Sequence, residues 1–118
     1  MSITNKIKVG IVGGSGYTGG ELIRLLINHP NVDISFINSK TYTGKKVVDI
    51  HKELIGELEM KFIGKIKDCY VMFLCLWHNK LEEFLRKESI NIKTKIIDLS
   101  QDFRLKKSLI GKDRKSVV

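Results

Sequence analysis

Ten residues near the start of this 118-residue chain restrict its fold more than any other segment. They read Gly-Ile-Val-Gly-Gly-Ser-Gly-Tyr-Thr-Gly at positions 10 to 19, and the pattern G-x-G-x-x-G begins at Gly14. A second register places Gly10, Gly13 and Gly16 three residues apart. Glycine has no Cβ, so the backbone amides can approach a pyrophosphate closely and φ can be positive. The segment therefore predicts a phosphate-binding turn, with cofactor-binding residues Gly13, Gly14, Ser15, Gly16, Tyr17, Thr18 and Gly19.

The segments on either side of the turn supply the strand and helix that such a motif requires. Alternating apolar residues over 7–12 predict a first strand. After the turn, a helix is predicted from about Thr18 to His29, and Pro30 ends it. Its apolar stripe consists of Leu22, Leu25, Leu26 and His29. The amino end of this helix would direct its amides and positive dipole end at an anion.

A second strand completes the unit, because Val32, Ile34 and Phe36 alternate with polar residues. Strand, turn, helix and strand within about 30 residues form a βαβ unit, and this favours a dinucleotide as the ligand. The alternative is a glycine turn that binds nothing.

The residues after the second strand indicate which dinucleotide is bound. An NAD-binding chain places Asp or Glu there to accept hydrogen bonds from the ribose hydroxyls. This chain has Ile37-Asn38-Ser39-Lys40 instead. A hydroxyl and an ammonium suit a 2′-phosphate, so Ser39 and Lys40 are predicted to bind NADP in preference to NAD. The alternative is that residues 39–44 form a solvated loop.

The rest of the chain continues to alternate strands and helices. Expected elements are a helix over 48–58, a strand over 60–62, a buried strand over 70–76, an amphipathic helix around Leu81, Phe84 and Leu85, and a strand over 95–100. This order predicts an α/β, Rossmann-like, doubly wound parallel sheet with right-handed crossovers.

Both cysteines, Cys69 and Cys75, belong to the apolar run over 69–76 and are expected to be inert. Cys75 lies nearer the carboxyl end, so contact with the cofactor is an alternative for it. Along an extended strand they would lie about 20 Å apart, too far for a disulfide.

A transmembrane helix needs about 20 apolar residues, so the apolar run over 69–76 is not expected to span a membrane. A cytoplasmic location is the simplest expectation.

Four segments together resemble N-acetyl-γ-glutamyl-phosphate reductase, a member of the aspartate-semialdehyde dehydrogenase superfamily that acts in arginine biosynthesis. They are Val-Gly-Ile-Val-Gly-Gly-Ser-Gly-Tyr-Thr-Gly-Gly-Glu-Leu (9–22), Asn-His-Pro (28–30), Ser-Lys-Thr-Tyr-Thr-Gly-Lys-Lys-Val (39–47) and Ile-Asp-Leu-Ser-Gln-Asp-Phe-Arg-Leu-Lys (97–106). The match covers nearly all of this chain and less than half of the family's length.

The resemblance implies an NADPH-dependent reduction of an acyl phosphate. In the family a cysteine thiolate displaces phosphate, hydride reduces the thioester, and a histidine assists. The family's Asn-Pro-Gly-Cys-Tyr type segment does not occur here, so no catalytic residue is assigned in this chain. The family forms homo-oligomers through a domain that is expected to be absent.

Two further segments are expected near the cofactor. In Leu-Trp-His-Asn (76–79), His78 matches the family and is expected to line the cofactor site, with a loop-capping role as the alternative; Trp77 and Asn79 depart from the family pattern. Ser100 is expected to contact the cofactor and Arg104 the substrate. The three histidines show no ligand spacing, so no metal is predicted.

The net charge of +8 raises a different class of function, nucleic-acid binding. Residues 106–118 hold five cations and one aspartate, which is half of that net charge, so the charge does not form one recognition stripe. We expect a dinucleotide-binding domain over 1–107, a basic tail over 108–118, and a truncated or fragmentary chain that is inactive alone. The alternatives are a free-standing NADP-binding sensor or partner protein and a basic nucleic-acid-binding module.

Overall fold

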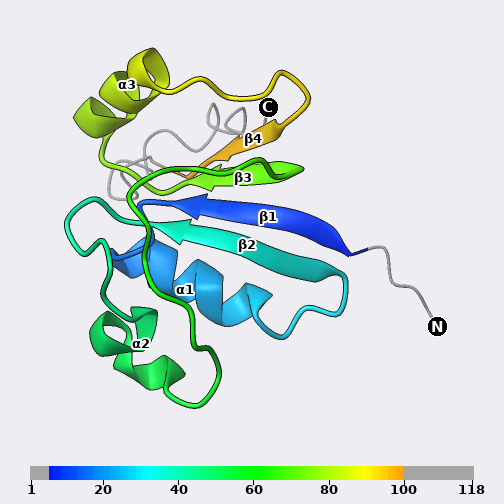
Figure 1. Cartoon of the computed structure of the whole chain (residues 1–118), viewed down its shortest axis with the longest axis vertical. Coiled ribbons are helices and arrows are strands. Elements are labelled where there is room, and N and C mark those ends of the chain that lie inside the picture. The colour runs from blue at the N-terminus through cyan, green and yellow to red at the C-terminus, as the bar shows by residue number, and fades with distance from the viewer. Residues whose placement is uncertain (1–5, 100–118) are drawn as a thin grey trace, which may run out of the picture.

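A parallel four-stranded sheet with the order β2-β1-β3-β4 organises the chain (Figure 1). The structure is a computed structural model that describes residues 6–99, apart from the side chains of His78 and Asn79. The strands are β1 (Ile7–Val12), β2 (Val32–Asn38), β3 (Val71–Leu74) and β4 (Lys95–Asp98). Because β1 connects to β2 on one side and pairs with β3 on the other, the sheet reverses its winding direction between β1 and β3.

Helices cover both faces of the sheet. The helices α1 (Tyr17–Leu26) and α2 (Val47–Ile50), with the 3-10 turn η1 (Lys52–Leu54), lie on one face, and α3 (His78–Lys87) lies on the other (Figure 1). The predicted doubly wound, Rossmann-like α/β fold is therefore confirmed.

Two apolar clusters form the core, one on each face of the sheet. The cluster under α1 and α2 contains Val9, Ile11, Ile23, Ile37, Val47, Leu54 and Phe62. The cluster under α3 contains Val12, Phe36, Met72, Leu74 and Phe84. Alternate residues of β1 thus enter opposite clusters, as the period of two in an extended strand requires. Gly10 of β1 lies beneath the ring of Phe36, which occupies the space of a Cβ at that position.

An irregularity in β2 changes the face on which its last residues lie. Val9 pairs with Ile34, but Gly10 pairs with Phe36, so Ser35 has no partner in the ladder. Ile34 packs in the α1 cluster, whereas Phe36 is buried in the α3 cluster. The expected alternation through Phe36 is therefore wrong at its last step, because an extra residue in one strand shifts all following side chains to the other face.

The segment between β2 and β3 contains less regular structure than expected. The predicted helix over 48–58 is replaced by α2, η1 and a turn at Gly56, where φ is +88°. The predicted strand over 60–62 reduces to isolated bridges, Lys46 with Lys61 and Asn38 with Ile63. Phe62 is nevertheless fully buried, so its apolar side chain fills the core without a strand around it.

The remaining elements are shorter than predicted. Helix α1 ends at Leu26 rather than His29, and Leu25 is 60% exposed although it was assigned to the apolar stripe. Ile23, with Gly19 and Gly20, is buried instead, because a helix this close to the sheet needs small residues on the contact face. Strand β3 covers four residues of the predicted run over 70–76, and Tyr70 is exposed.

Substitution of Gly10 by alanine should reduce stability. A Cβ there collides with the Phe36 ring, and overpacking of this kind costs about 1 to 3 kcal/mol. Gly16→Ala is the matched control, because a Cβ at Gly16 has no heavy atom within 4 Å and its φ is −87°. Urea unfolding of both variants measures the difference. Equal stability of the two variants would contradict the packing described for Gly10.

Candidate functional site

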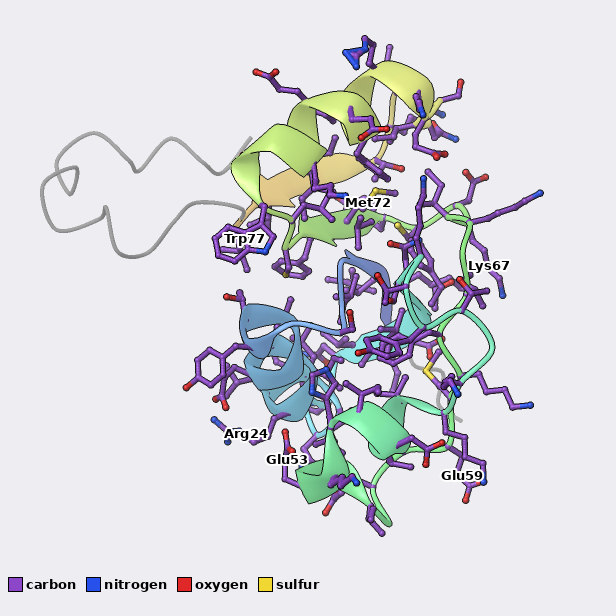
Figure 2. All side chains as sticks on the ribbon, turned by 90° about the vertical axis from the view of Figure 1, so that its left-hand side faces the viewer. Arg24, Glu53, Glu59, Lys67, Met72 and Trp77 are labelled. Atoms are coloured by element: carbon purple, nitrogen blue, oxygen red, sulfur yellow. The ribbon has the colours of Figure 1, made fainter. Side chains whose placement is uncertain are left out.

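A pocket of about 350 Å³ opens at the carboxyl edge of the sheet, beside the point where the winding reverses. Ligands of open α/β sheets bind at this place. Figure 2 looks onto this edge, with Trp77 beside the amino end of α3 and Met72 between the sheet and that helix. Three segments line the pocket: the glycine turn after β1, the loop after β2, and the end of β3 with α3.

The glycine turn is held by the last residue of β2. The N–H of Gly13 donates to the carbonyl oxygen of Asn38 at 3.1 Å and to its Oδ1 at 3.2 Å, and the N–H of Gly14 donates to the same carbonyl at 2.8 Å. Gly13 has φ +79°, and a Cβ on it would lie 2.6 Å from the carbonyl oxygen of Cys75. Only glycine satisfies both conditions, which explains why the motif places it there.

The other turn glycines divide into packed and open positions. A Cβ at Gly19 would lie 2.7 Å from the Cα of Gly14, so α1 starts in close contact with the turn. Gly16, by contrast, has open space where a Cβ would be, and it caps α1 without a side-chain hydrogen bond.

Backbone N–H groups remain available to a ligand at the amino end of α1. Within residues 6–99, the amides of Ser15, Gly16 and Tyr17 have no hydrogen-bond acceptor. Several unpaired N–H groups at a helix amino end, beside open space, form the donor set that a pyrophosphate requires. The residues present thus fit a dinucleotide.

Ser39 links the loop after β2 to the glycine turn. The residue is only 3% exposed, its hydroxyl donates to Ser15 Oγ at 3.1 Å, and that hydroxyl accepts from the N–H of Tyr42 at 3.2 Å. The two predicted site residues Ser15 and Ser39 are therefore in contact. Ser39 already has protein partners in this structure, so it shapes the pocket wall as well as lining it.

Lysines gather around the same pocket from two elements. Lys40 and Thr41 come from the loop after β2, while Lys80, Glu83 and Lys87 come from α3. Glu83 Oε2 accepts from Lys87 Nζ at 3.1 Å. This hydrogen bond and the charge of Lys87, with smaller effects of Lys80 and Lys40, lower the pKa of Glu83.

Sequence reasoning identified Lys40 but missed Lys80 and Lys87. The signal that would have found them is their spacing, because positions 80, 83, 84 and 87 of a helix share one face. Phe84 on that face is buried, so its neighbours Lys80 and Lys87 are brought to the pocket rim.

Both cysteines are free, and neither has the environment of a nucleophile. Burial, followed by the nearby charge of Asp98, raises the pKa of Cys75 to about 12. Burial also raises the pKa of Cys69. Cys75 lines the pocket as a neutral thiol, and its contact with the cofactor stays a prediction.

The other predicted contacts are only partly covered by the structure. Trp77 lines the pocket and is 66% exposed. His78 is the first residue of α3, but its side chain lies outside the described part, as do Ser100 and Arg104. These three remain predictions.

Residues 6–99 show neither a metal-binding group nor a membrane-spanning helix. No group of three or more His, Cys, Asp or Glu side chains in that range is arranged to hold a metal ion. None of the helices described there is both long and apolar enough to cross a bilayer.

Comparisons with known proteins agree with this geometry. The family model described as semialdehyde dehydrogenase, NAD binding domain, matches residues 8–117. The N-acetyl-gamma-glutamyl-phosphate reductase of Christiangramia forsetii is 50% identical over 101 residues, which are 85% of this chain and 32% of that protein. The reductase of the same name from Flavobacterium johnsoniae is 50% identical over 110 residues, 91% of this chain and 34% of that protein. The chain thus spans about a third of the length of these curated relatives.

Among solved structures, aspartate semialdehyde dehydrogenase with NADP from Candida albicans superposes with a TM-score of 0.64. Its sequence is 19% identical, and the match covers 85% of this chain and 31% of that chain. At this identity the likeness supports the fold alone. The reductase relatives, in contrast, confirm the resemblance that the sequence segments indicated.

Cys75 should be unreactive in the folded chain. With a pKa of about 12, its thiolate fraction at pH 8 is about one in ten thousand. In Cys69→Ser, which keeps only Cys75, alkylation at pH 8 should be at least about 100-fold slower in the native state than in urea. Native labelling at the unfolded rate would contradict the burial described here.

The same shift predicts a pH dependence of stability. Because the folded pKa lies above the reference value of 9.0, the contribution of Cys75 is fully present below pH 9.0 and is lost as the pH rises toward about 12. Urea unfolding of Cys75→Ala, measured against the parent chain across this range, isolates that contribution.

Proposed function

Because the chain belongs to the family of semialdehyde dehydrogenase NAD-binding domains, we propose that it is the NADP-binding part of an N-acetyl-γ-glutamyl-phosphate reductase. The observation that carries this proposal is the set of unpaired amides beside the open space at Gly16. When bound, the dinucleotide supplies the hydride for reduction of an acyl phosphate.

The pyrophosphate would be held by main-chain donors. Ser15, Gly16 and Tyr17 provide adjacent amides, and the dipole of α1 adds positive potential at the same place. These donors are part of the backbone, so they are oriented before the ligand arrives.

The 2′-phosphate would be held between the loop after β2 and α3, where the lysines of the pocket gather. Lys40 lies there, and Lys80 and Lys87 approach from α3. A dianionic phosphate suits three ammonium groups, which outnumber the two carboxylates of the pocket, Glu83 and Glu88. The proposal therefore specifies NADP rather than NAD.

The chemical step would belong to residues outside this chain. The family's reaction needs a cysteine thiolate, and the pKa values of Cys69 and Cys75 are both raised by burial. A neutral thiol is a poor nucleophile. This chain would bind and orient the dinucleotide, and the remainder of a full-length reductase would supply the nucleophile and the substrate site.

Reversal of the charge at Lys40 tests the cofactor assignment. Lys40→Asp removes a charge-assisted contact to the 2′-phosphate and adds repulsion, so the Kd for NADPH should rise about 10- to 100-fold. The Kd for NADH, which lacks that phosphate, should change less than about threefold. Quenching of Trp77, the single tryptophan of the chain, provides the titration signal.

The matched control is Lys67→Asp, which makes the same charge change at an exposed lysine away from Trp77 (Figure 2). It should leave both affinities within about twofold, because a distant exposed charge is screened by salt. If the parent chain, shown to be folded, binds neither nucleotide, the proposed function fails. If Lys40→Asp weakens both nucleotides equally, only the assignment of the 2′-phosphate site fails.

A turnover assay tests whether the catalytic nucleophile lies outside this chain. The chain alone should produce no NADPH from NADP, phosphate and N-acetylglutamate semialdehyde, because it has no activated thiol. Addition of the separately made remainder of a full-length relative should restore measurable NADPH formation. Turnover by the chain alone, abolished by Cys75→Ala, would overturn the assignment of the nucleophile to residues outside it.

A further inference from the structure

His51 is a buried histidine that contacts the glycine turn from a distant part of the sequence. It lies between α2 and η1 and is only 7% exposed. Its Nε2 is 2.6 Å from the carbonyl oxygen of Gly14, across 37 residues of sequence. A carbonyl oxygen only accepts, so Nε2 must carry the hydrogen of this bond.

The imidazole ring is fixed by its surroundings. A Cβ at Gly20 would lie 2.7 Å from the ring atoms Cε1 and Nδ1, so α1 contacts the ring directly through a residue without a side chain. On another side, the ring of Phe62 meets it edge-on at a centroid distance of 6.3 Å. Such packing holds Nε2 toward Gly14.

The bond to His51 determines how the next peptide group is turned. Gly14 is anchored at both ends, because its N–H donates to the carbonyl oxygen of Asn38 and its C=O accepts from His51. In a planar trans peptide, the C=O of one residue and the N–H of the next point in opposite directions. Since the Gly14 carbonyl is turned inward to His51, the N–H of Ser15 is turned away from it, and Ser15 lines the pocket.

We propose that His51 is a positioning residue of the dinucleotide site, which aims the Ser15 amide at the pyrophosphate by holding the Gly14 carbonyl. The inference rests on the proposed function, because it assigns a ligand group to that amide. It links the α2 region, which contributes no lining residue to the pocket, to the shape of the phosphate turn. The imidazole acts through the backbone and does not contact the cofactor.

Two substitutions separate the hydrogen bond from the packing. His51→Phe keeps an aromatic ring and removes the donor, whereas His51→Gln restores an N–H donor. His29→Phe is the control, since His29 is an exposed histidine outside the pocket. Circular dichroism and thermal melting establish which variants are folded.

The ligand pair NADPH and 2′-AMP distinguishes positioning of the turn from general damage. 2′-AMP carries the adenosine and the 2′-phosphate but no pyrophosphate, so it reports on the Lys40 side of the pocket alone. His51→Phe should weaken NADPH about tenfold, the effect of one well-placed hydrogen bond, and change 2′-AMP less than about twofold. His51→Gln should recover NADPH affinity to within about threefold of the parent.

A second measurement needs no ligand. A long-range nitrogen–proton NMR spectrum of the parent chain should show His51 with its proton on Nε2, and hydrogen exchange should show the Ser15 amide exposed. In folded His51→Phe, the exchange rates of Gly14 and Ser15 should change, while those of the His29→Phe control should not.

The outcomes are distinguishable. Equal loss of NADPH and 2′-AMP, or no loss of either in a folded His51→Phe, overturns the positioning role. A proton on Nδ1 with Nε2 bare also overturns it, even if His51→Phe fails to fold. If the parent chain binds no NADPH, the proposed function is wrong. The tautomer of His51 and the exchange rates of the Gly14 and Ser15 amides then still decide whether His51 holds the turn.

Discussion

The carbonyl group of Asn38 is the contact on which the rest of the site depends. Asn38 is the last residue of β2, it is paired with Val12, and its carbonyl accepts the amides of Gly13 and Gly14. Its side chain also accepts from Gly13 and donates to the carbonyl of Ile63 at 3.3 Å. One residue thus joins β2, the turn and the returning chain. Loss of these contacts would leave buried amides unpaired, which is costly, so the conformation of the turn is coupled to the sheet itself.

This coupling explains how a small domain presents a precise anion site. The donors are backbone groups at the amino end of α1. The cations are Lys40 from the loop after β2 and Lys80 and Lys87 from α3, which lies on the face of the sheet opposite to α1. An anion between Lys40 and Lys80 would attract both walls of the pocket. Ligand binding is therefore expected to stabilise the fold as well as fill the site, because it favours only the state in which the two walls face each other.

Short-range patterns predicted the parts of the fold that short-range forces determine. The alternation of β1, the glycine turn and the helix around Phe84 need only neighbouring residues, and each was found where expected, although Leu85, which was predicted for the apolar face of that helix, is 46% exposed. Failures arose where packing with distant residues prevailed. The irregularity at Ser35 moved Phe36 to the other face, the turn at Gly56 interrupted the helix predicted over 48–58, and isolated bridges replaced the strand predicted over 60–62. No local pattern specifies which strand takes an extra residue, because that depends on the partner strand.

The site shows the same division. The turn residues and Ser39 lie together as the motif required, yet the partner of Ser39 is Ser15 rather than solvent, a contact that links two loops 24 residues apart. The role of His51 could not be predicted from the sequence. Its hydrogen-bond partner is the backbone carbonyl of Gly14, and since every residue has a carbonyl, no residue type near Gly14 indicates this contact. The contact follows from the position of His51, between α2 and η1, against α1, where the absence of a side chain at Gly20 admits the ring. A glycine that seems to extend the phosphate motif is thus needed for packing, and through His51 that packing reaches the turn.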